Sequence, residues 1–79
     1  MHVKVLFFGA TADAVGRRAV EMAFEGHINA EEALYAIQAE YPRLAKHKLL
    51  FARNQEYVKG DESIADGDEL AVFTAVSGG

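Results

Sequence analysis

Ile28-Asn29-Ala30-Glu31-Glu32 is the clearest helix-start signal in this sequence. Asn29 is a residue type favoured at the N-cap, and Glu32, three positions later, can return a hydrogen bond to it, as in a capping box. Apolar residues then recur at helical spacing until Pro42 ends the pattern. The positions of this apolar stripe are Ala30, Ala33, Leu34, Ile37 and Tyr41. The sequence therefore predicts a helix over residues 29–41 whose apolar side covers a sheet.

Two strand patterns precede this helix. Residues 2–8 alternate between two faces. The set that we expect to face the core is uniformly apolar: Val3, Val5 and Phe7. The other set begins polar and ends in Leu6 and Phe8, which we expect on an outward face. Residues 18–25 alternate in the same way, and the connection over residues 9–16 has room for one or two helical turns closed by its final glycine. We expect the two strands to form an antiparallel pair.

Further strand signals follow the helix. Leu49–Arg53 is a short apolar run, and Asn54-Gln55 would turn the chain into a short partner strand over residues 56–59. Residues 60–68 have the composition of a loop. Residues 69–74 form the final strand, in which alternate side chains again fall on opposite faces.

This order predicts an α+β fold, with a mixed sheet of about five strands and one main helix packed across one face. The simplest topology places the first and last strands side by side and parallel in the middle of the sheet, which is the β-grasp, or ubiquitin-like, arrangement. Leu70 and Val72 then face the helix. Leu6, Phe8 and Phe73 share the opposite face. Adjacent exposed aromatic side chains there are typical of an interaction surface, unless a loop covers them.

Composition limits the possible functions. Seventy-nine residues are enough for one domain, residues 1–79, and a chain that is 51% hydrophobic and 25% charged is globular rather than disordered. The net charge is −4 and the basic residues are scattered, which disfavours nucleic acid and anionic membranes as partners. The lack of cysteine excludes disulfides and thiolate metal sites. Residues 1–9 contain too short an apolar run for a signal peptide or a membrane span, so we expect a cytoplasmic protein.

Neither the acidic residues nor the histidines have the spacing of a metal site. Five acidic residues fall within nine positions: Asp61, Glu62, Asp66, Asp68 and Glu69. They lack the regular ligand alternation of an EF-hand, which favours a solvated loop over a metal site. His2, His27 and His47 are far apart in the sequence and are interpreted as surface residues. The site prediction therefore includes no metal.

The sequence ends in Val76-Ser77-Gly78-Gly79. We expect no further element for a turn to join, and two residues without side chains make the thinnest tail that a polypeptide can form. We expect residues 75–79 to be a flexible tail that can enter a narrow channel with its carboxylate leading. A frayed end of small residues is the alternative interpretation. The β-grasp body that precedes the tail favours the first.

With these features the chain resembles the small subunit of molybdopterin synthase, the MoaD-like branch of the ubiquitin-related sulfur carriers (the MoaD/ThiS superfamily). The resemblance spans nearly the whole length. It rests on short motifs in a fixed order: Lys4-Val5-Leu6-Phe7-Phe8, Ala14-Val15-Gly16, Glu32-Ala33-Leu34, Arg53-Asn54-Gln55, Asp66-Gly67-Asp68-Glu69-Leu70 and Val76-Ser77-Gly78-Gly79. One departure is Thr74-Ala75, where many members carry two prolines, so the φ angle is not fixed there by a proline ring.

The resemblance implies a sulfur carrier that is not catalytic alone. A MoeB-like adenylating enzyme would use ATP to convert the Gly79 carboxylate into an acyl-adenylate. A sulfur donor, such as a cysteine desulfurase system, would then displace AMP and leave a thiocarboxylate. The chain itself is expected to bind no cofactor.

In the family, the large subunit receives this tail, with Gly78 passing where a side chain would collide. The sulfur goes to a cyclic pyranopterin precursor, in molybdenum cofactor biosynthesis. The resemblance and the outward face together give the expected contacts with the large subunit: Leu6, Phe8, Phe73, Val76 and Ser77.

Other functions share the fold and the terminus. A thiamine-pathway sulfur carrier would supply a thiazole, but its members tend to be shorter between the first strand and the helix than this chain is at residues 9–16. A ubiquitin-like protein modifier would be joined to target lysines through Gly79. A binding module with an accidental Gly-Gly end is a further alternative. A catalytic enzyme in its own right is disfavoured, because the sequence has no nucleophile–base set and no phosphate loop.

Overall fold

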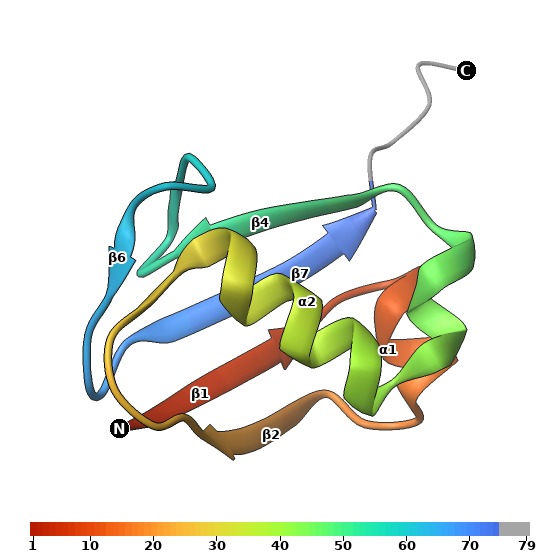
Figure 1. Cartoon of the computed structure of the whole chain (residues 1–79). Coiled ribbons are helices and arrows are strands. Elements are labelled where there is room, and N and C mark those ends of the chain that lie inside the picture. Colours follow the sequence, from red (N-terminus) through yellow and green to blue (C-terminus); the bar gives the residue numbers. More distant parts are fainter. Residues whose placement is uncertain (75–79) are drawn as a thin grey trace.

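The parallel pairing of the first and last strands is the centre of the molecule. The computed structural model describes residues 1–74. Its elements, in order, are β1 (His2–Phe7), α1 (Ala10–Val15), β2 (Ala19–Ala23), β3 (Ile28–Asn29), α2 (Ala30–Glu40), the 3-10 helix η1 (Pro42–Lys46), β4 (Leu49–Arg53), β5 (Glu56–Tyr57), β6 (Ser63–Ile64) and β7 (Glu69–Thr74). Within these residues, five strands form one mixed sheet in the order β2-β1-β7-β4-β5. The helix α2 lies across one face of this sheet (Figure 1). The predicted β-grasp arrangement is confirmed.

Strand register fixes which side chains face α2. In the parallel pair, Val5 is opposite Leu70 and Phe7 is opposite Val72. The strands β2 and β4 add antiparallel neighbours on either side of this pair. The inward side chains of the two central strands are almost completely buried: Val3, Val5, Phe7, Leu70 and Val72. The predicted direction, neighbours and faces of these strands are therefore correct.

The helix α2 begins at the predicted capping box. The Asn29 Oδ1 accepts a hydrogen bond from the Glu32 N–H at 2.8 Å, and the Glu32 Oε1 accepts one from the Asn29 N–H at 3.0 Å. The helix ends at Glu40, just before Tyr41 and Pro42. Its buried side chains come from the predicted stripe: Ala30, Ala33 and Ile37. The cap and the stripe together fix where the helix starts and which side of it packs on the sheet.

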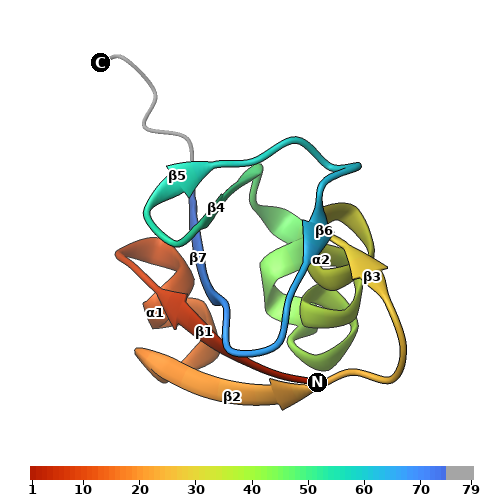
Figure 2. The same ribbon diagram turned by 90° about the vertical axis from the view of Figure 1, so that its left-hand side faces the viewer.

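Three small elements were not predicted from the sequence: β3, β6 and η1. Ile28 pairs with Ile64 and Asn29 with Ser63, so β3 and β6 form a second, two-stranded sheet. Figure 2 shows these two strands next to one another beside α2. The prediction that residues 60–68 form only a loop is therefore wrong at β6, because a two-residue strand is too short to show a periodic pattern. The 3-10 helix η1, which also went unpredicted, buries Leu44 in the core.

Strand ends differ from the predicted bounds by one or two residues. The first strand ends at Phe7 rather than at residue 8, and the second covers Ala19–Ala23 rather than residues 18–25. The short partner strand covers Glu56–Tyr57 rather than residues 56–59. Gly9, with a φ of +57°, turns the chain just after the first strand, which explains why the alternation stops there.

Thr11 connects α1 to the central strands. Its hydroxyl accepts a hydrogen bond from the Phe8 N–H at 3.0 Å and lies 2.7 Å from the Val72 carbonyl oxygen and 2.9 Å from that of Phe8. The single hydroxyl proton can be donated to one of these oxygens at a time. Val72 is opposite Phe7, the last residue of β1, and the Thr11 hydroxyl is a second donor, beside the Phe8 N–H, for its carbonyl oxygen. A fully buried hydroxyl is stable there because it is hydrogen-bonded.

The capping box should contribute measurably to the free energy of unfolding. We expect Asn29→Ala to lower this free energy by about 1 kcal/mol, because it removes the acceptor of the Glu32 N–H. Asn29→Ser keeps a capping oxygen and is the matched control. Urea unfolding followed by circular dichroism measures both. Equal stability of the Ala and Ser variants would show that the side-chain cap contributes nothing.

Candidate partner interface and tail exit

The end of β7 is held on both sides. Thr74, the last residue that the structure describes, is opposite Leu49 on β4. On the other side, the Val72 carbonyl oxygen accepts hydrogen bonds from the Phe8 N–H at 3.3 Å and from the Thr11 hydroxyl. The point from which residue 75 continues is therefore fixed relative to the sheet. The predicted site residues Val76, Ser77, Gly78 and Gly79 lie outside the described residues.

An apolar patch surrounds this end of the sheet on the face opposite α2. Phe73 is opposite Leu50 in the register, and the Tyr57 ring centroid lies 5.9 Å from that of Phe73. Leu6 and Phe8 alternate with the inward-facing Phe7 and so belong to the same outward face. Phe8 is 50% exposed and Tyr57 is 73% exposed. We call this set the outer-face patch: Leu6, Phe8, Leu50, Tyr57 and Phe73.

The sequence analysis found part of this patch. It places Leu6, Phe8 and Phe73 on one outward face, as the strand register does, and their role in an interface stays a prediction. It missed Leu50 and Tyr57. The signal for Tyr57 was the Asn54-Gln55 pair, whose positive φ angles of 50° and 72° suit a two-residue hairpin turn. Such a turn pairs the flanking residues directly and so fixes the face on which Tyr57 lies.

The large side chains of the outward face near the start of β7 are charged. Lys4 of β1 is opposite Glu21 of β2 and Glu69 of β7. These residues lie toward the start of β7, whereas the outer-face patch lies toward its end. The apolar part of this face is thus concentrated where the chain leaves the sheet. A protein that covered the patch would also be positioned to receive residues 75–79.

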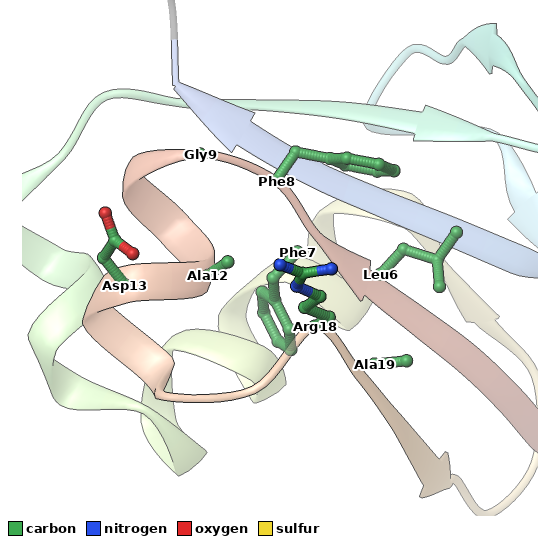
Figure 3. A pocket seen from close by; sticks show the side chains of 8 residues that line it. All are labelled: Leu6, Phe7, Phe8, Gly9, Ala12, Asp13, Arg18 and Ala19. Atoms are coloured by element: carbon green, nitrogen blue, oxygen red, sulfur yellow. The ribbon is translucent and has the colours of Figure 1, made fainter.

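A hollow of about 520 Å³ adjoins the outer-face patch at the end of β1. Leu6 and Phe8 belong to both the patch and the hollow. The remaining lining residues are Phe7, Gly9, Ala12, Asp13, Arg18 and Ala19. Figure 3 shows the Arg18 side chain extending toward Phe8 and Leu6, while the Asp13 carboxylate points away from it. The hollow therefore combines apolar walls with one cationic group, Arg18, and one carboxylate, that of Asp13, which is turned away from it.

The acidic residues near the C-terminal end of the sequence have structural partners. Three of them bond within the fold: Asp66 to the His2 N–H, Asp68 to the Ala65 N–H, and Glu62 to the Arg53 guanidinium. Among residues 1–74, no group of three or more His, Cys, Asp or Glu side chains could hold a metal ion. His2 and His27 are exposed and His47 is partly buried. In the same part of the chain, no helix is both long and apolar enough to cross a membrane.

Comparison with known proteins identifies the family of this chain. The ThiS family matches residues 5–79. The chain is 40% identical to the molybdopterin synthase sulfur carrier subunit of Escherichia coli (strain K12), over 98% of this chain and 99% of that protein. It is 35% identical to the Homo sapiens protein of the same name, over 99% and 94% of the two chains. These relatives match the chain over almost their whole length.

Solved structures share the fold. The crystal structure of SAMP1 from Haloferax volcanii superposes with a TM-score of 0.87, at 29% identity, over 100% of both chains. A chain in the protein–protein complex of subunits 1 and 2 of molybdopterin-converting factor from Helicobacter pylori 26695 superposes with a TM-score of 0.71, at 24% identity, over 100% of both chains. At that identity the second likeness shows the fold alone. The chain thus belongs to the ThiS family and has its ubiquitin-like β-grasp fold.

Proposed function

We propose that this chain is a sulfur carrier and the small subunit of a molybdopterin synthase, working in the cytoplasm and not catalytic alone. The observation that carries the proposal is the 40% identity, over nearly the whole of both chains, to a protein named molybdopterin synthase sulfur carrier subunit. The outer-face patch around the end of β7 supports it, because a carrier must bind its partner next to the tail that it delivers. On this proposal the catalytic acids and bases belong to the partner proteins.

The reacting group in this proposal is the Gly79 carboxylate. An ionised carboxylate is a poor acceptor for a sulfur nucleophile, so it must first be activated. A carboxylate oxygen attacks the α-phosphorus of ATP on an adenylating enzyme, and pyrophosphate leaves. A sulfur nucleophile then attacks the carbonyl carbon, and AMP leaves with the oxygen. The net change at Gly79 is the replacement of one oxygen by sulfur.

The partner in this proposal is a large subunit that holds the pterin precursor. The Helicobacter pylori structure is a complex of two different subunits, which supports a heteromeric assembly for a chain of this fold. Docking of the outer-face patch would place residues 75–79 at the partner, with Val76 and Ser77 as further contacts. Gly78 and Gly79 have no side chains to collide with the walls of a narrow channel.

A ubiquitin-like protein modifier is the second candidate function. The observation that favours it is the likeness to SAMP1, the small archaeal modifier protein 1 of Haloferax volcanii. A modifier would also be adenylated at Gly79, but the acyl group would pass to a lysine of a target protein. A thiamine-pathway carrier would pass sulfur to a thiazole. The step after adenylation is what distinguishes the three.

Sulfur loading at Gly79 tests the proposal directly. Incubated with an adenylating enzyme from the same organism, ATP and a sulfide source, the chain should gain the mass of one oxygen-to-sulfur exchange, located at Gly79 by fragmentation. One residue added after Gly79 should abolish loading, because the carboxylate is displaced from the nucleotide. Unfolding curves of both proteins provide the control for folding.

The loaded chain should then lose its sulfur to a pterin product when mixed with the large subunit and the precursor. Transfer to a thiazole synthase instead would identify a thiamine-pathway carrier, and an isopeptide bond to lysine would identify a modifier. Absence of any mass change with every adenylating enzyme of the organism would overturn the sulfur-carrier proposal.

The outer-face patch is tested by matched aromatic substitutions. Phe8→Asp should weaken binding of the large subunit by about 2 kcal/mol, because it puts a charge in an apolar contact. Tyr35→Asp is the control, since Tyr35 is an aromatic residue of α2 that is 64% exposed and lies outside the patch. Titration calorimetry measures binding, and circular dichroism checks the fold. Equal affinities of the two variants would show that the patch is not the docking surface.

A further inference from the structure

The backbone of Arg18 is fixed at the mouth of the hollow next to the outer-face patch. Its carbonyl oxygen accepts a hydrogen bond from the Phe7 N–H at 2.9 Å, just before β2 begins. This bond connects the residue before β2 to the end of β1. The Arg18 side chain extends from there toward Phe8 and Leu6 (Figure 3). The guanidinium therefore extends from a backbone position that is hydrogen-bonded to β1, one residue before β2 begins.

The charge of Arg18 is not neutralised within the described fold. The one ion pair formed between residues 1 and 74 joins Arg53 and Glu62. Arg18 and its neighbour Arg17 are both exposed, and the nearby Asp13 carboxylate points away from Arg18. In a chain with a net charge of −4, this is a local cationic group beside apolar walls. A carboxylate on a partner protein would complement the positive charge of Arg18.

The hollow suits a protein side chain better than a small molecule. Sites for small molecules usually have several polar groups that converge on the ligand. Here Arg18 is the charged group directed toward the apolar walls, which include Leu6, Phe8, Ala12 and Ala19. A volume of about 520 Å³ has ample room for a large apolar side chain. Anchor residues of protein interfaces commonly fill such pockets.

We propose that this hollow is the anchor pocket for the large subunit. It takes an apolar side chain of that subunit, and a neighbouring carboxylate of the same subunit pairs with Arg18. The inference rests on the proposed function, which supplies the large subunit as the partner. The hollow shares Leu6 and Phe8 with the outer-face patch, so one partner can cover both. It adds a charged, specificity-determining contact to a surface that is otherwise apolar.

Charge reversal at Arg18 tests the ion pair. Arg18→Glu should weaken binding of the recombinant large subunit from the same organism by about tenfold or more, because it places like charges together. Arg43→Glu makes the same change at an exposed position of η1 and should leave the affinity unchanged. The salt dependence of binding should be weaker for the Arg18 variant than for the unsubstituted chain. Acidic residues of the large subunit are then changed to Lys one at a time, and one of them should restore binding to Arg18→Glu.

Filling the hollow tests the apolar contact without changing the charge. Ala19→Phe should weaken binding of the large subunit by about tenfold, because it occupies the space that the partner side chain needs. Ala23→Phe is the control, since Ala23 is exposed on the same face of β2 but does not line the hollow. Circular dichroism should show both variants folded.

Failure of this inference differs from failure of the proposed function. If the unsubstituted chain loads sulfur and binds the large subunit, but Arg18→Glu and Ala19→Phe bind equally well, the anchor pocket is wrong and the carrier function stands. If Arg18→Glu slows adenylation and leaves the affinity for the large subunit unchanged, the hollow serves the adenylating enzyme, and the inference is also wrong.

Discussion

The parallel pairing of β1 with β7 is the constraint on which the rest of this molecule depends. Parallel strands cannot be joined by a tight turn, so the chain between them must cross over, and α2 makes that crossing over the inward face. The same pairing aligns the ends of both strands. Phe8, which follows β1, and Phe73, near the end of β7, therefore lie at the same end of the sheet. The outer-face patch and the exit of residues 75–79 come together for this reason.

The position of this exit depends on groups that hold β7 beyond its pairing with β1. Gly9 turns the chain away after Phe8, and the Thr11 hydroxyl joins the Phe8 N–H as a hydrogen-bond donor to the Val72 carbonyl oxygen. On the other side, Leu49 pairs with Thr74. On the proposed function residues 75–79 enter a partner, and a fixed starting point favours this because less conformational freedom has to be lost on binding.

Much of the fold could be predicted because it depends on periodic patterns and on local rules. The alternation in β1 and β7 gave their faces, and the Asn29 and Glu32 pair gave the start of α2. The sheet of β3 and β6 could not be predicted, because pairing of two residues leaves no period and Ile64 is a lone apolar residue within an acidic stretch. The hollow at Arg18 could not be predicted either. It forms from residues of β1, α1 and the start of β2, whose relative positions only the tertiary structure defines.

The central claim is that partner binding is centred on the outer-face patch at the end of β7. Chemical-shift mapping tests it most directly: the isotope-labelled chain is titrated with unlabelled large subunit, and the perturbed backbone amides are identified. The account predicts that the largest perturbations fall on Leu6, Phe8, Tyr57 and Phe73 and on the residues that follow Thr74. Perturbations centred on the exposed side of α2, or on β3 and β6, would contradict it.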